Sequence, residues 1–425
     1  MSKLMTIGLG YIGLPTALSF AKSGEEVVGV DISSEIVSQL NQGIVHLEEP
    51  GVAELLAEVL ADGTFRASTT PEQADVFIIS VPTPNQNDKY HSCDFQYVDQ
   101  AVQSILPFLQ KGNTVIIEST IPPKTTVNRI QPMIESYGFV VGEDIYLVHC
   151  PERVLPGKIL WELRRNNRII GGVTKRCAEK GKEIYGKFVE GELILAGASE
   201  AELSKLMENT YRDINIAIAN ELVKVGDDLE IDVLKVIEMA NKHPRVHIHQ
   251  PGPGVGGHCL AVDPYFVVAA SPENTELIQT ARAINSNMPT FIVQKTKQLM
   301  DNICGKKITI FGLAYKGNID DIRESPAIEV LRLLKETTNY EISVYDPHVQ
   351  IDQLTQNKSD ALRNSDLVLI LTDHAEFKQI TEADFSHMKQ RYLLDTKQVY
   401  EHSNSSVHYY SLGDISRIKQ EKLSV

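Results

Sequence analysis

Short apolar runs along the chain end in small or acidic residues and alternate with segments of helical spacing. The apolar run Thr6–Leu9 leads into the glycine cluster Gly8–Gly13, a helical stretch follows, and the next strand, EVVGV, ends at Asp31. Two further β-branched runs, ADVFIISVPTP at 74–84 and NTVIIEST at 113–120, end in small polar residues. Strand, turn, helix and strand in this order predict an open parallel sheet, in which ligands bind beyond the carboxyl ends of the strands.

The same order of elements returns in the last third of the chain. KITIFGLAYKG at 307–317 precedes the helical SPAIEVLRLLKE and the strand EISVYDP, which ends at Asp346. SDLVLILTDH at 365–374 then matches ADVFIISV, and RYLLDTK at 391–397 matches VIIEST. We therefore predict the α/β class, with two doubly wound Rossmann-like domains.

A long helix is predicted between these two domains, from Ser199 to about Val225, because no Gly or Pro interrupts this segment. Ser199 and Glu202 are spaced as a capping box at its start. Its apolar positions keep helical spacing: Leu203, Leu206, Met207, Thr210, Ile214, Ala217, Ile218 and Leu222. At about 1.5 Å per residue the helix is roughly 40 Å long, enough to span two domains. We expect it to be a core or dimer-interface helix, and its apolar stripe predicts a homodimer.

Three domains follow from this pattern. They are a Rossmann-like domain at 1–198, a central helical domain at 199–300 and a second Rossmann-like domain at 301–425.

One face of the long helix carries Lys205, Asn209 and Arg212 at i, i+4 and i+7. Three polar groups on one face indicate either a solvated surface or a site.

Composition narrows the functional classes. The formal charge of −15 without any basic run argues against nucleic acid or an anionic membrane as partner. The five cysteines are scattered, so they encode neither a disulfide framework nor a zinc site, and a reducing cytoplasm fits them best. We find no signal peptide and no apolar stretch of about 18 residues that would span a membrane.

The glycine cluster has the context of a dinucleotide fingerprint. Gly8, Gly10 and Gly13 form GxGxxG between a strand and a helix, and Asp31 lies eighteen residues after the third glycine. Such glycines let the backbone approach a pyrophosphate at a helix N-terminus. A carboxylate at Asp31 accepts from ribose hydroxyls and repels a 2′-phosphate, which predicts NAD rather than NADP.

Cys259 lies in PGPGVGGHCL at 251–260, where the surrounding glycines leave little to bury it against. We expect this loop to wrap a substrate and to present the sulfur to it. A thiolate there, favoured by Lys205 or by a protonated His258, would add to an aldehyde. Loss of hydride then leaves a thioester, and Glu152 and Asp263 are the candidate groups to activate water for its hydrolysis. Starting from an alcohol, the sequence of steps consumes two NAD.

Several motifs in order resemble the UDP-glucose/GDP-mannose dehydrogenase family and cover nearly the whole chain. They are GLGYIGLP, the strand ends SVPTP and EST, CPER at 150–153, the Lys205–Asn209 spacing, PGPGVGGHCLAVDP and GLAYKGNIDDIRESPA at 312–327. The resemblance implies a metal-free, NAD-dependent, four-electron oxidation of the C6 alcohol of a UDP-sugar to a carboxylate, in a pathway to a surface polysaccharide.

The resemblance also implies roles for single residues. In the catalytic set, Cys259 is the nucleophile, Lys205 and Asn209 stabilise the oxyanion, Asp263 and Thr120 orient water, and Glu152 assists hydrolysis. The cofactor set is Gly8, Gly10, Tyr11, Ile12, Gly13, Asp31, Thr83, Thr120 and Arg323. The substrate set is Arg153, Val154, Leu155, Lys205, Asn209, Arg212, Arg245, His247, Gly254, Gly256, His258, Tyr315 and Lys316.

One departure from the family pattern bears on the substrate. The UDP-glucose branch carries a second glutamate four residues after the one that matches Glu152, and this chain has Pro156 there. Pro156 weakens UDP-glucose as the substrate, and the resemblance implies a UDP-N-acetylhexosamine, UDP-N-acetyl-D-mannosamine before UDP-N-acetylglucosamine or UDP-glucose. His258 is a substrate contact or a catalytic group, and His243, His247 and His249 lack the neighbours of a metal site.

Two other functions compete with this interpretation. A β-hydroxyacid dehydrogenase shares the N-terminal fold and a Lys-x-x-x-Asn pair, but it performs one hydride transfer and needs neither Cys259 nor a third domain. A non-catalytic NAD-binding protein is the second alternative, which the complete catalytic set opposes.

Overall fold

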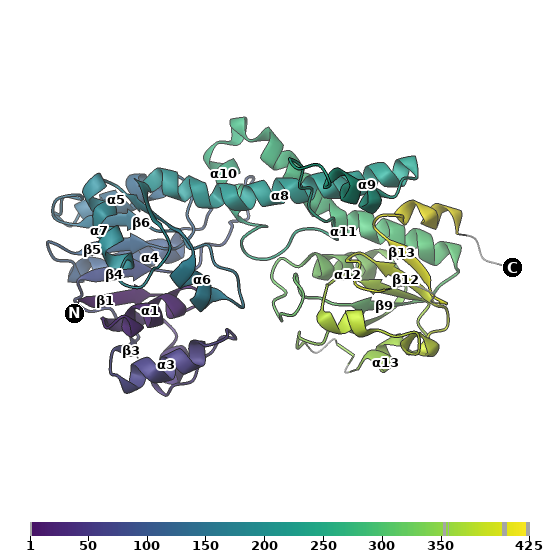
Figure 1. The fold of residues 1–425 in the computed structure, drawn as a ribbon, viewed down its shortest axis with the longest axis horizontal. Coiled ribbons are helices and arrows are strands. Elements are labelled where there is room, and N and C mark those ends of the chain that lie inside the picture. The colour runs from purple at the N-terminus through teal and green to yellow at the C-terminus, as the bar shows by residue number, and fades with distance from the viewer. Residues whose placement is uncertain (1, 352–353, 356, 402–405, 422–425) are drawn as a thin grey trace. The chain divides into compact units, whose positions relative to one another are not determined.

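The computed structural model describes residues 2–351, 354–355, 357–401 and 406–421. Its contacts divide the chain into two compact units, Met1–Glu208 with Tyr265–Pro272, and Asn209–Pro264 with Glu273–Val425. Each unit contains one sheet, and both sheets can be followed in Figure 1. The boundaries of the three predicted domains stay a prediction.

The first unit is built on an eight-stranded sheet in the order β3-β2-β1-β4-β5-β6-β7-β8. Neighbouring strands are parallel except β6 and β7, which are antiparallel. The strands are β1 Lys3–Ile7, β2 Glu26–Val30, β3 Phe65–Ser68, β4 Val76–Ile79, β5 Thr114–Ile117, β6 Tyr146–His149, β7 Arg168–Gly172 and β8 Leu193–Gly197.

Both faces of this sheet are covered by apolar packing. In β4, Val76 and Ile78 belong to the cluster formed with α1, α2, α3 and α7, whereas Phe77 and Ile79 belong to the cluster formed with α4 and α5. Because successive side chains of a strand point to opposite faces, an unbroken apolar run is the signature of such double coverage. The helices of this unit are α1 Gly13–Lys22, α2 Ser34–Asn41, α3 Val52–Ala61, α4 Gln96–Ile105, α5 Gln131–Glu135, α6 Ile159–Arg165 and α7 Lys175–Tyr185.

The second unit repeats this plan with five parallel strands in the order β10-β9-β11-β12-β13. Its strands are β9 Lys307–Phe311, β10 Glu341–Tyr345, β11 Leu367–Ile370, β12 Tyr392–Asp395 and β13 His408–Ser411. In β11, Leu367 and Leu369 pack on one side, and Val368 and Ile370 on the other, as in β4. The predicted α/β class with a repeated doubly wound sheet is confirmed.

Helices of the central and C-terminal segments complete the second unit. Besides α8, which the two units share, they are α9 Val233–Ala240, α11 Glu276–Asn302, α12 Pro326–Thr337 and α13 Lys358–Leu362. Helix α10, Asp263–Ala270, begins in the second unit, and its residues 265–270 belong to the first. Short 3₁₀ turns lie at 106–108, 272–274, 375–379, 384–387 and 415–420, and a π-helical turn at 126–130.

The predicted long helix is α8, Ala198–Leu229, and the division between the units falls within it. The predicted capping box is wrong. Glu202 does not close its own helix: its carboxylate accepts from the backbone N–H groups of Lys124 (2.5 Å) and Thr126 (2.7 Å), and from the Thr126 hydroxyl (2.6 Å). Burial raises the pKa of Glu202 to about 7, and these hydrogen bonds oppose the shift. The residue ties α8 to the segment that follows β5.

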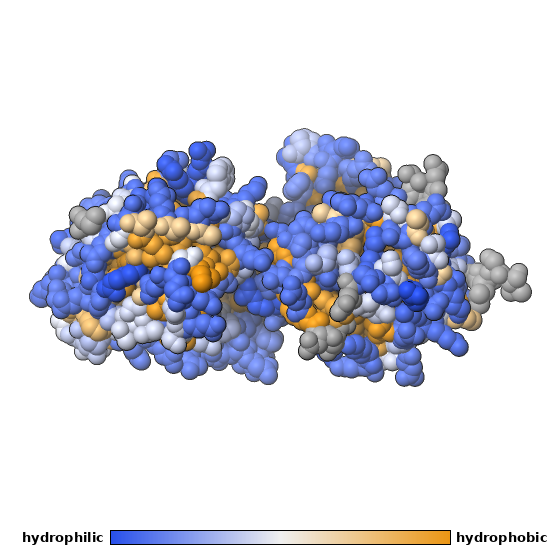
Figure 2. Space-filling view, turned by 90° about the horizontal axis from the view of Figure 1, so that it is seen from below, coloured by the Kyte–Doolittle hydropathy of each residue, from blue (hydrophilic) through white to orange (hydrophobic). Residues whose placement is uncertain are grey.

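Hydrophilic residues cover most of the face shown in Figure 2, and hydrophobic residues gather in a few places on each unit. Within the described residues, no helix combines the length and the apolar composition that crossing a membrane requires.

Candidate active site

The glycine cluster forms the turn between β1 and α1. Gly8 has φ of +93° and donates its N–H to the Val30 carbonyl at 2.8 Å. A Cβ on Gly13 would lie 1.9 Å from the Gly8 carbonyl oxygen, so the close approach of turn and helix requires glycine there. A Cβ on Gly10 would meet no protein atom within 4 Å. Gly10 therefore borders open space, which is what a pyrophosphate would fill.

Asp31 lies at the end of β2, beside this turn. Its carboxylate accepts from the backbone N–H of Leu9 at 3.0 Å and of Ser33 at 2.9 Å, and the residue remains half-buried. The next side chain, Ile32, is 94% exposed. A large aliphatic side chain so exposed beside the fingerprint is suited to cover the adenine of a dinucleotide, and the sequence reasoning missed it.

The second unit repeats the turn but uses its acid differently. Gly312 has φ of +90°, as Gly8 does, but Asp346 at the end of β10 is buried. Its carboxylate accepts from the N–H groups of Leu313 (2.7 Å) and His348 (2.9 Å), and bonds His374 Nε2 at 3.1 Å. Burial opposes its charge, but these hydrogen bonds hold the pKa of Asp346 below its usual range. The Asp346 carboxylate thus accepts more internal hydrogen bonds than that of Asp31, and it is buried where Asp31 is half-buried.

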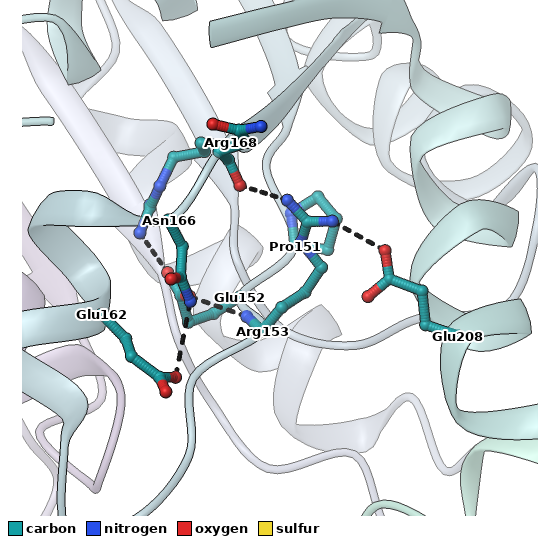
Figure 3. A pocket seen from close by; sticks show the side chains of 8 residues that line it. Pro151, Glu152, Arg153, Glu162, Asn166, Arg168 and Glu208 are labelled. Atoms are coloured by element: carbon teal, nitrogen blue, oxygen red, sulfur yellow. Dashed lines mark hydrogen bonds and ion pairs between the residues drawn. The ribbon is translucent and has the colours of Figure 1, made fainter. Parts of the chain in front are cut away.

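The predicted catalytic Glu152 lies in the first unit, in the segment after β6 (Figure 3). One oxygen of its carboxylate is paired with the Arg168 guanidinium, and the other accepts from the Arg153 backbone N–H at 2.7 Å. The Arg153 side chain bonds Glu208 at 2.7 Å and the Asn167 carbonyl. These residues line a polar cavity of about 270 Å³. The sequence analysis did not identify Arg168. The only feature of the sequence that marks it is its charge at the first position of the otherwise apolar strand RIIGG.

Lys205 is 5% exposed, which is incompatible with a purely solvated polar face on α8. Along this face Asn209 is half-buried and Arg212 is exposed. Burial and, as a smaller cause, the charge of Lys205 lower the pKa of His149, the last residue of β6, to about 3. A lysine and a neutral histidine therefore share a buried environment in the first unit.

Asn209 and Asp263 meet in the second unit. The Asn209 amide donates to the Asp263 carboxylate at 2.5 Å, and Asp263 is 1% exposed. The Asp263 backbone N–H in turn donates to the Cys259 carbonyl at 2.8 Å. Cys259, half-buried, therefore lies in the turn that opens α10, one hydrogen-bonded step from the Asn209–Asp263 pair.

The glycines before Cys259 serve close packing. A Cβ on Gly256 would lie 2.6 Å from the Glu324 carbonyl, and one on Gly257 would lie 2.7 Å from the Tyr315 ring. The start of the loop is held as well, because the Gly252 N–H donates to the Asn220 side chain at 2.9 Å. The expectation that these glycines leave little to pack against is wrong for this part of the loop, because they allow it to lie against Glu324 and Tyr315.

His258 and Arg323 share one partner that the sequence reasoning missed, Asp321. Arg323 bonds the Asp321 carboxylate at 2.6 Å, and His258 Nδ1 lies 3.8 Å from it. Burial opposes the charge of Asp321, but the hydrogen bonds from Arg323 hold its pKa below the usual value. Asp321 therefore orients Arg323 of the predicted cofactor set and lies beside His258 of the predicted substrate set.

The other predicted residues lie on accessible loops and turns. Half-buried positions are Ile12, Thr83, Thr120, Val154, Gly254, Tyr315 and Lys316, and exposed ones are Tyr11, Leu155, Arg245 and His247. Their roles toward substrate and cofactor stay predictions.

Family models match three consecutive parts of the chain. Residues 2–189 match the NAD binding domain of the UDP-glucose/GDP-mannose dehydrogenase family, 199–287 its central domain and 309–402 its UDP binding domain. The resemblance inferred from the motifs and the NAD cofactor are thus confirmed.

Named relatives are similar over nearly their whole length. A UDP-N-acetyl-D-mannosamine dehydrogenase of Methanococcus vannielii is 46% identical, with 95% of this chain and 94% of the relative covered. An NDP-N-acetyl-D-galactosaminuronic acid dehydrogenase of Ralstonia solanacearum is 42% identical, with 93% and 96% covered. Among solved structures, a UDP-N-acetyl-mannosamine dehydrogenase of Staphylococcus aureus is 58% identical, with a TM-score of 0.93 and 98% of this chain and 100% of that chain covered.

The open space at Gly10 gives a test that separates ligand binding from folding. Gly10→Ala should leave the thermal midpoint near the wild-type value, because its Cβ meets no protein atom, but should weaken NAD binding at least about tenfold, or about 1.4 kcal/mol. Gly13→Ala is the matched control, since its Cβ clashes with the Gly8 carbonyl and should lower the thermal midpoint itself. Calorimetric titration measures the affinity for NAD, and thermal unfolding measures the midpoint. Wild-type affinity for NAD in Gly10→Ala would show that no ligand approaches Gly10.

Proposed function

We propose, because the chain belongs to the UDP-glucose/GDP-mannose dehydrogenase family, that it oxidises the C6 alcohol of UDP-N-acetyl-D-mannosamine to the carboxylate. Membership makes the chain an NAD-dependent nucleotide-sugar dehydrogenase. The observation that carries the chemistry is the turn from Cys259 to Asp263, with Asn209 bonded to the aspartate. The likeness to UDP-N-acetyl-D-mannosamine dehydrogenases over most of the chain supports the choice of sugar.

The residues of the first unit fit NAD. The turn of Gly8, Gly10 and Gly13 leaves space at a helix N-terminus for the pyrophosphate, and Asp31 would accept from the adenosine ribose. Ile32 would cover the adenine, while Thr83 and Thr120 would act near the nicotinamide; Arg323 of the predicted cofactor set belongs to the second unit. When bound, NAD supplies the hydride acceptor for both oxidations.

Cys259 would act between the two oxidations. Its thiolate adds to the C6 aldehyde and forms a C–S bond, which gives a thiohemiacetal whose oxidation leaves a thioester. Lys205 and Asn209 would stabilise the negative charge that develops on the C6 oxygen, since a buried ammonium and an amide are suited to that task. Asn209 is held for this role by Asp263.

Hydrolysis would end the cycle. Water adds to the thioester carbon, Glu152 accepts its proton, the C–S bond breaks, and the Cys259 thiolate is restored. Thr120 and Asp263 would orient the water. Of these groups, Asp263 is 1% exposed, whereas Glu152 borders a polar cavity that can hold water, so Glu152 is the better base.

Most of the proposed substrate contacts lie in loops. Arg153, Val154 and Leu155 follow Glu152 directly, while Gly254, Gly256 and His258 shortly precede Cys259. Further contacts would come from Arg212, Arg245, His247, Tyr315 and Lys316. Pro156 replaces the second glutamate of UDP-glucose enzymes, which favours an N-acetylhexosamine.

A second candidate substrate differs only in its sugar. The Ralstonia relative is named for an N-acetyl-D-galactosaminuronic acid, so a UDP-N-acetylhexosamine other than the mannosamine is the alternative. A cytoplasmic location and a role in surface polysaccharide synthesis remain predictions from the cysteine pattern and the resemblance.

The cysteine mechanism makes a stoichiometric prediction. Wild-type enzyme should form two NADH per UDP-N-acetyl-D-mannosamine consumed, and Cys259→Ala should lower turnover at least about 10³-fold, roughly 4 kcal/mol, without loss of NAD affinity. NADH is measured by absorbance and sugar by chromatography, with Cys304→Ser as the control at an exposed cysteine. A Cys259→Ala enzyme with the wild-type rate and ratio would refute a covalent role.

Asp31 predicts the cofactor preference. kcat/KM should favour NAD over NADP at least about tenfold, roughly 1.4 kcal/mol, because a 2′-phosphate would meet the carboxylate. Asp31→Asn, which keeps an oxygen acceptor for Leu9, should reduce this preference. Equal use of both cofactors by the wild type would contradict the assignment.

The exposed side of α8 predicts a homodimer. Tyr211, Ile218, Val225 and Leu229 are 63%, 45%, 43% and 62% exposed at helical spacing, and a second copy would cover them. Light scattering at micromolar concentration should give about twice 47.3 kDa. Ile218→Glu should weaken the dimer at least about tenfold. Tyr137→Glu, at an exposed aromatic of the first unit, is the control; a wild-type monomer would disprove the prediction.

A further inference from the structure

A guanidinium lies between two carboxylates at the carboxyl ends of β5 and β6. Arg168 Nη1 is 3.2 Å from Glu118 Oε1, and its Nη2 is paired with Glu152 Oε2. The exposed fractions of the three side chains are 4%, 0% and 8% respectively. This is a buried ion-pair triad, with Glu118 on the inside and Glu152 at the cavity of Figure 3.

The inner half of the triad is held by further groups. Glu118 accepts from the Tyr185 hydroxyl at 2.6 Å and from the Ser80 hydroxyl at 2.7 Å. The Arg168 guanidinium also lies over the Tyr185 ring, 4.4 Å from its centre. Tyr185 thus contacts both charged groups, and its side chain is fully buried. Glu118 and Tyr185 therefore hold Arg168 in position independently of Glu152.

Burying such a triad has a high free-energy cost. Taking charged groups out of water costs several kcal/mol for each ion, and apolar residues of similar volume are often as stable or more so. Burial raises the pKa of Glu118, and the charge of Arg168 only opposes that shift. Stability alone does not account for the arrangement, but a requirement to fix one carboxylate does.

We propose that Arg168 is a positioning residue for Glu152 during hydrolysis of the thioester, with Glu118 and Tyr185 holding the arginine in place. The inference rests on the proposed function. In that step water forms a C–O bond to the thioester carbon, its proton goes to Glu152, and the C–S bond breaks to release the Cys259 thiolate. The guanidinium binds one oxygen of Glu152 and thereby fixes the direction of the carboxylate.

The geometry requires arginine in particular. A guanidinium has separate N–H groups that bond two carboxylates at once in a fixed plane, whereas the ammonium of lysine is a single point charge. The cavity beside Glu152 is large enough for several water molecules, and its lining of charged and amide groups is polar. Water can therefore reach the carboxylate that Arg168 holds.

Arg168→Lys tests the role through the lifetime of the acyl-enzyme. The variant should release two NADH per active site in a first burst at the wild-type rate, and then hydrolyse the thioester at least tenfold more slowly. The acyl-enzyme should accumulate and be visible as an adduct by intact mass. Affinity for NAD should stay within about twofold of the wild type. A merely structural role would slow the burst and weaken NAD binding as well, without accumulation of the adduct.

Two further variants complete the experiment. Arg165→Lys is the matched control, because Arg165 is 59% exposed and paired with Glu190, and it should behave as the wild type. Tyr185→Phe removes only the hydroxyl that bonds Glu118 and should slow acyl-enzyme decay at least threefold. If Arg168→Lys does not fold, as judged by circular dichroism, the rate of acyl-enzyme decay in Tyr185→Phe tests the positioning role instead.

The outcomes separate this inference from the proposed function. Wild-type enzyme that forms two NADH per sugar, with unchanged acyl-enzyme decay in Arg168→Lys or, failing that, in Tyr185→Phe, overturns only the positioning role. Wild-type enzyme that forms one NADH per sugar, or none with any UDP-N-acetylhexosamine, overturns the proposed function itself.

Discussion

Apolar side chains cover both faces of each sheet, and this packing restricts where the protein can bind a ligand. In β4 and β11 alternate side chains pack into opposite apolar layers, so no position within these strands is open to a ligand. Polar groups that act on a ligand must then follow the strand, where the chain leaves the sheet. Asp31 follows β2, Glu118 follows β5, and Glu152 lies three residues beyond β6. The packing of the sheet thus collects the acidic groups of the first unit at one edge.

The repeated fold shows that the same backbone can serve two purposes. Each unit has a strand, a turn with a glycine of positive φ, and an acid after the second strand. In the first unit the second glycine of the turn borders open space and the acid stays half-buried. In the second unit Ala314 occupies the position of that glycine, and His374 and backbone groups saturate Asp346. The two turns thus share a backbone and differ in the residue at the second glycine position and in the burial and hydrogen bonding of the acid.

Buried polar groups in this protein hold other groups in place. Glu202 joins α8 to the segment after β5, and Asn220 holds the beginning of the cysteine loop. The half-buried Asp321 holds Arg323 by hydrogen bonds. Each bond offsets part of the cost of removing a polar group from water, and each orients a loop that otherwise has few apolar contacts. Preorganised loops of this kind suit a reaction with several successive steps at one carbon atom.

The sequence by itself determined the two sheets, the long helix, the NAD turn and the cysteine loop. These features depend on the local spacing of apolar residues, on glycines at fixed offsets and on motifs that lie within a few residues of one another. Tertiary structure alone decided the partners of the acidic groups. Arg168 reaches Glu118 across 50 residues and Asp263 reaches Asn209 across 54. It also decided that Glu202 bonds residues 124 and 126 instead of capping its own helix, and that the cysteine-loop glycines pack against Tyr315 and Glu324. A hydrogen bond or a close contact depends on which distant segments the packing of the core brings together, and no spacing along the chain records that.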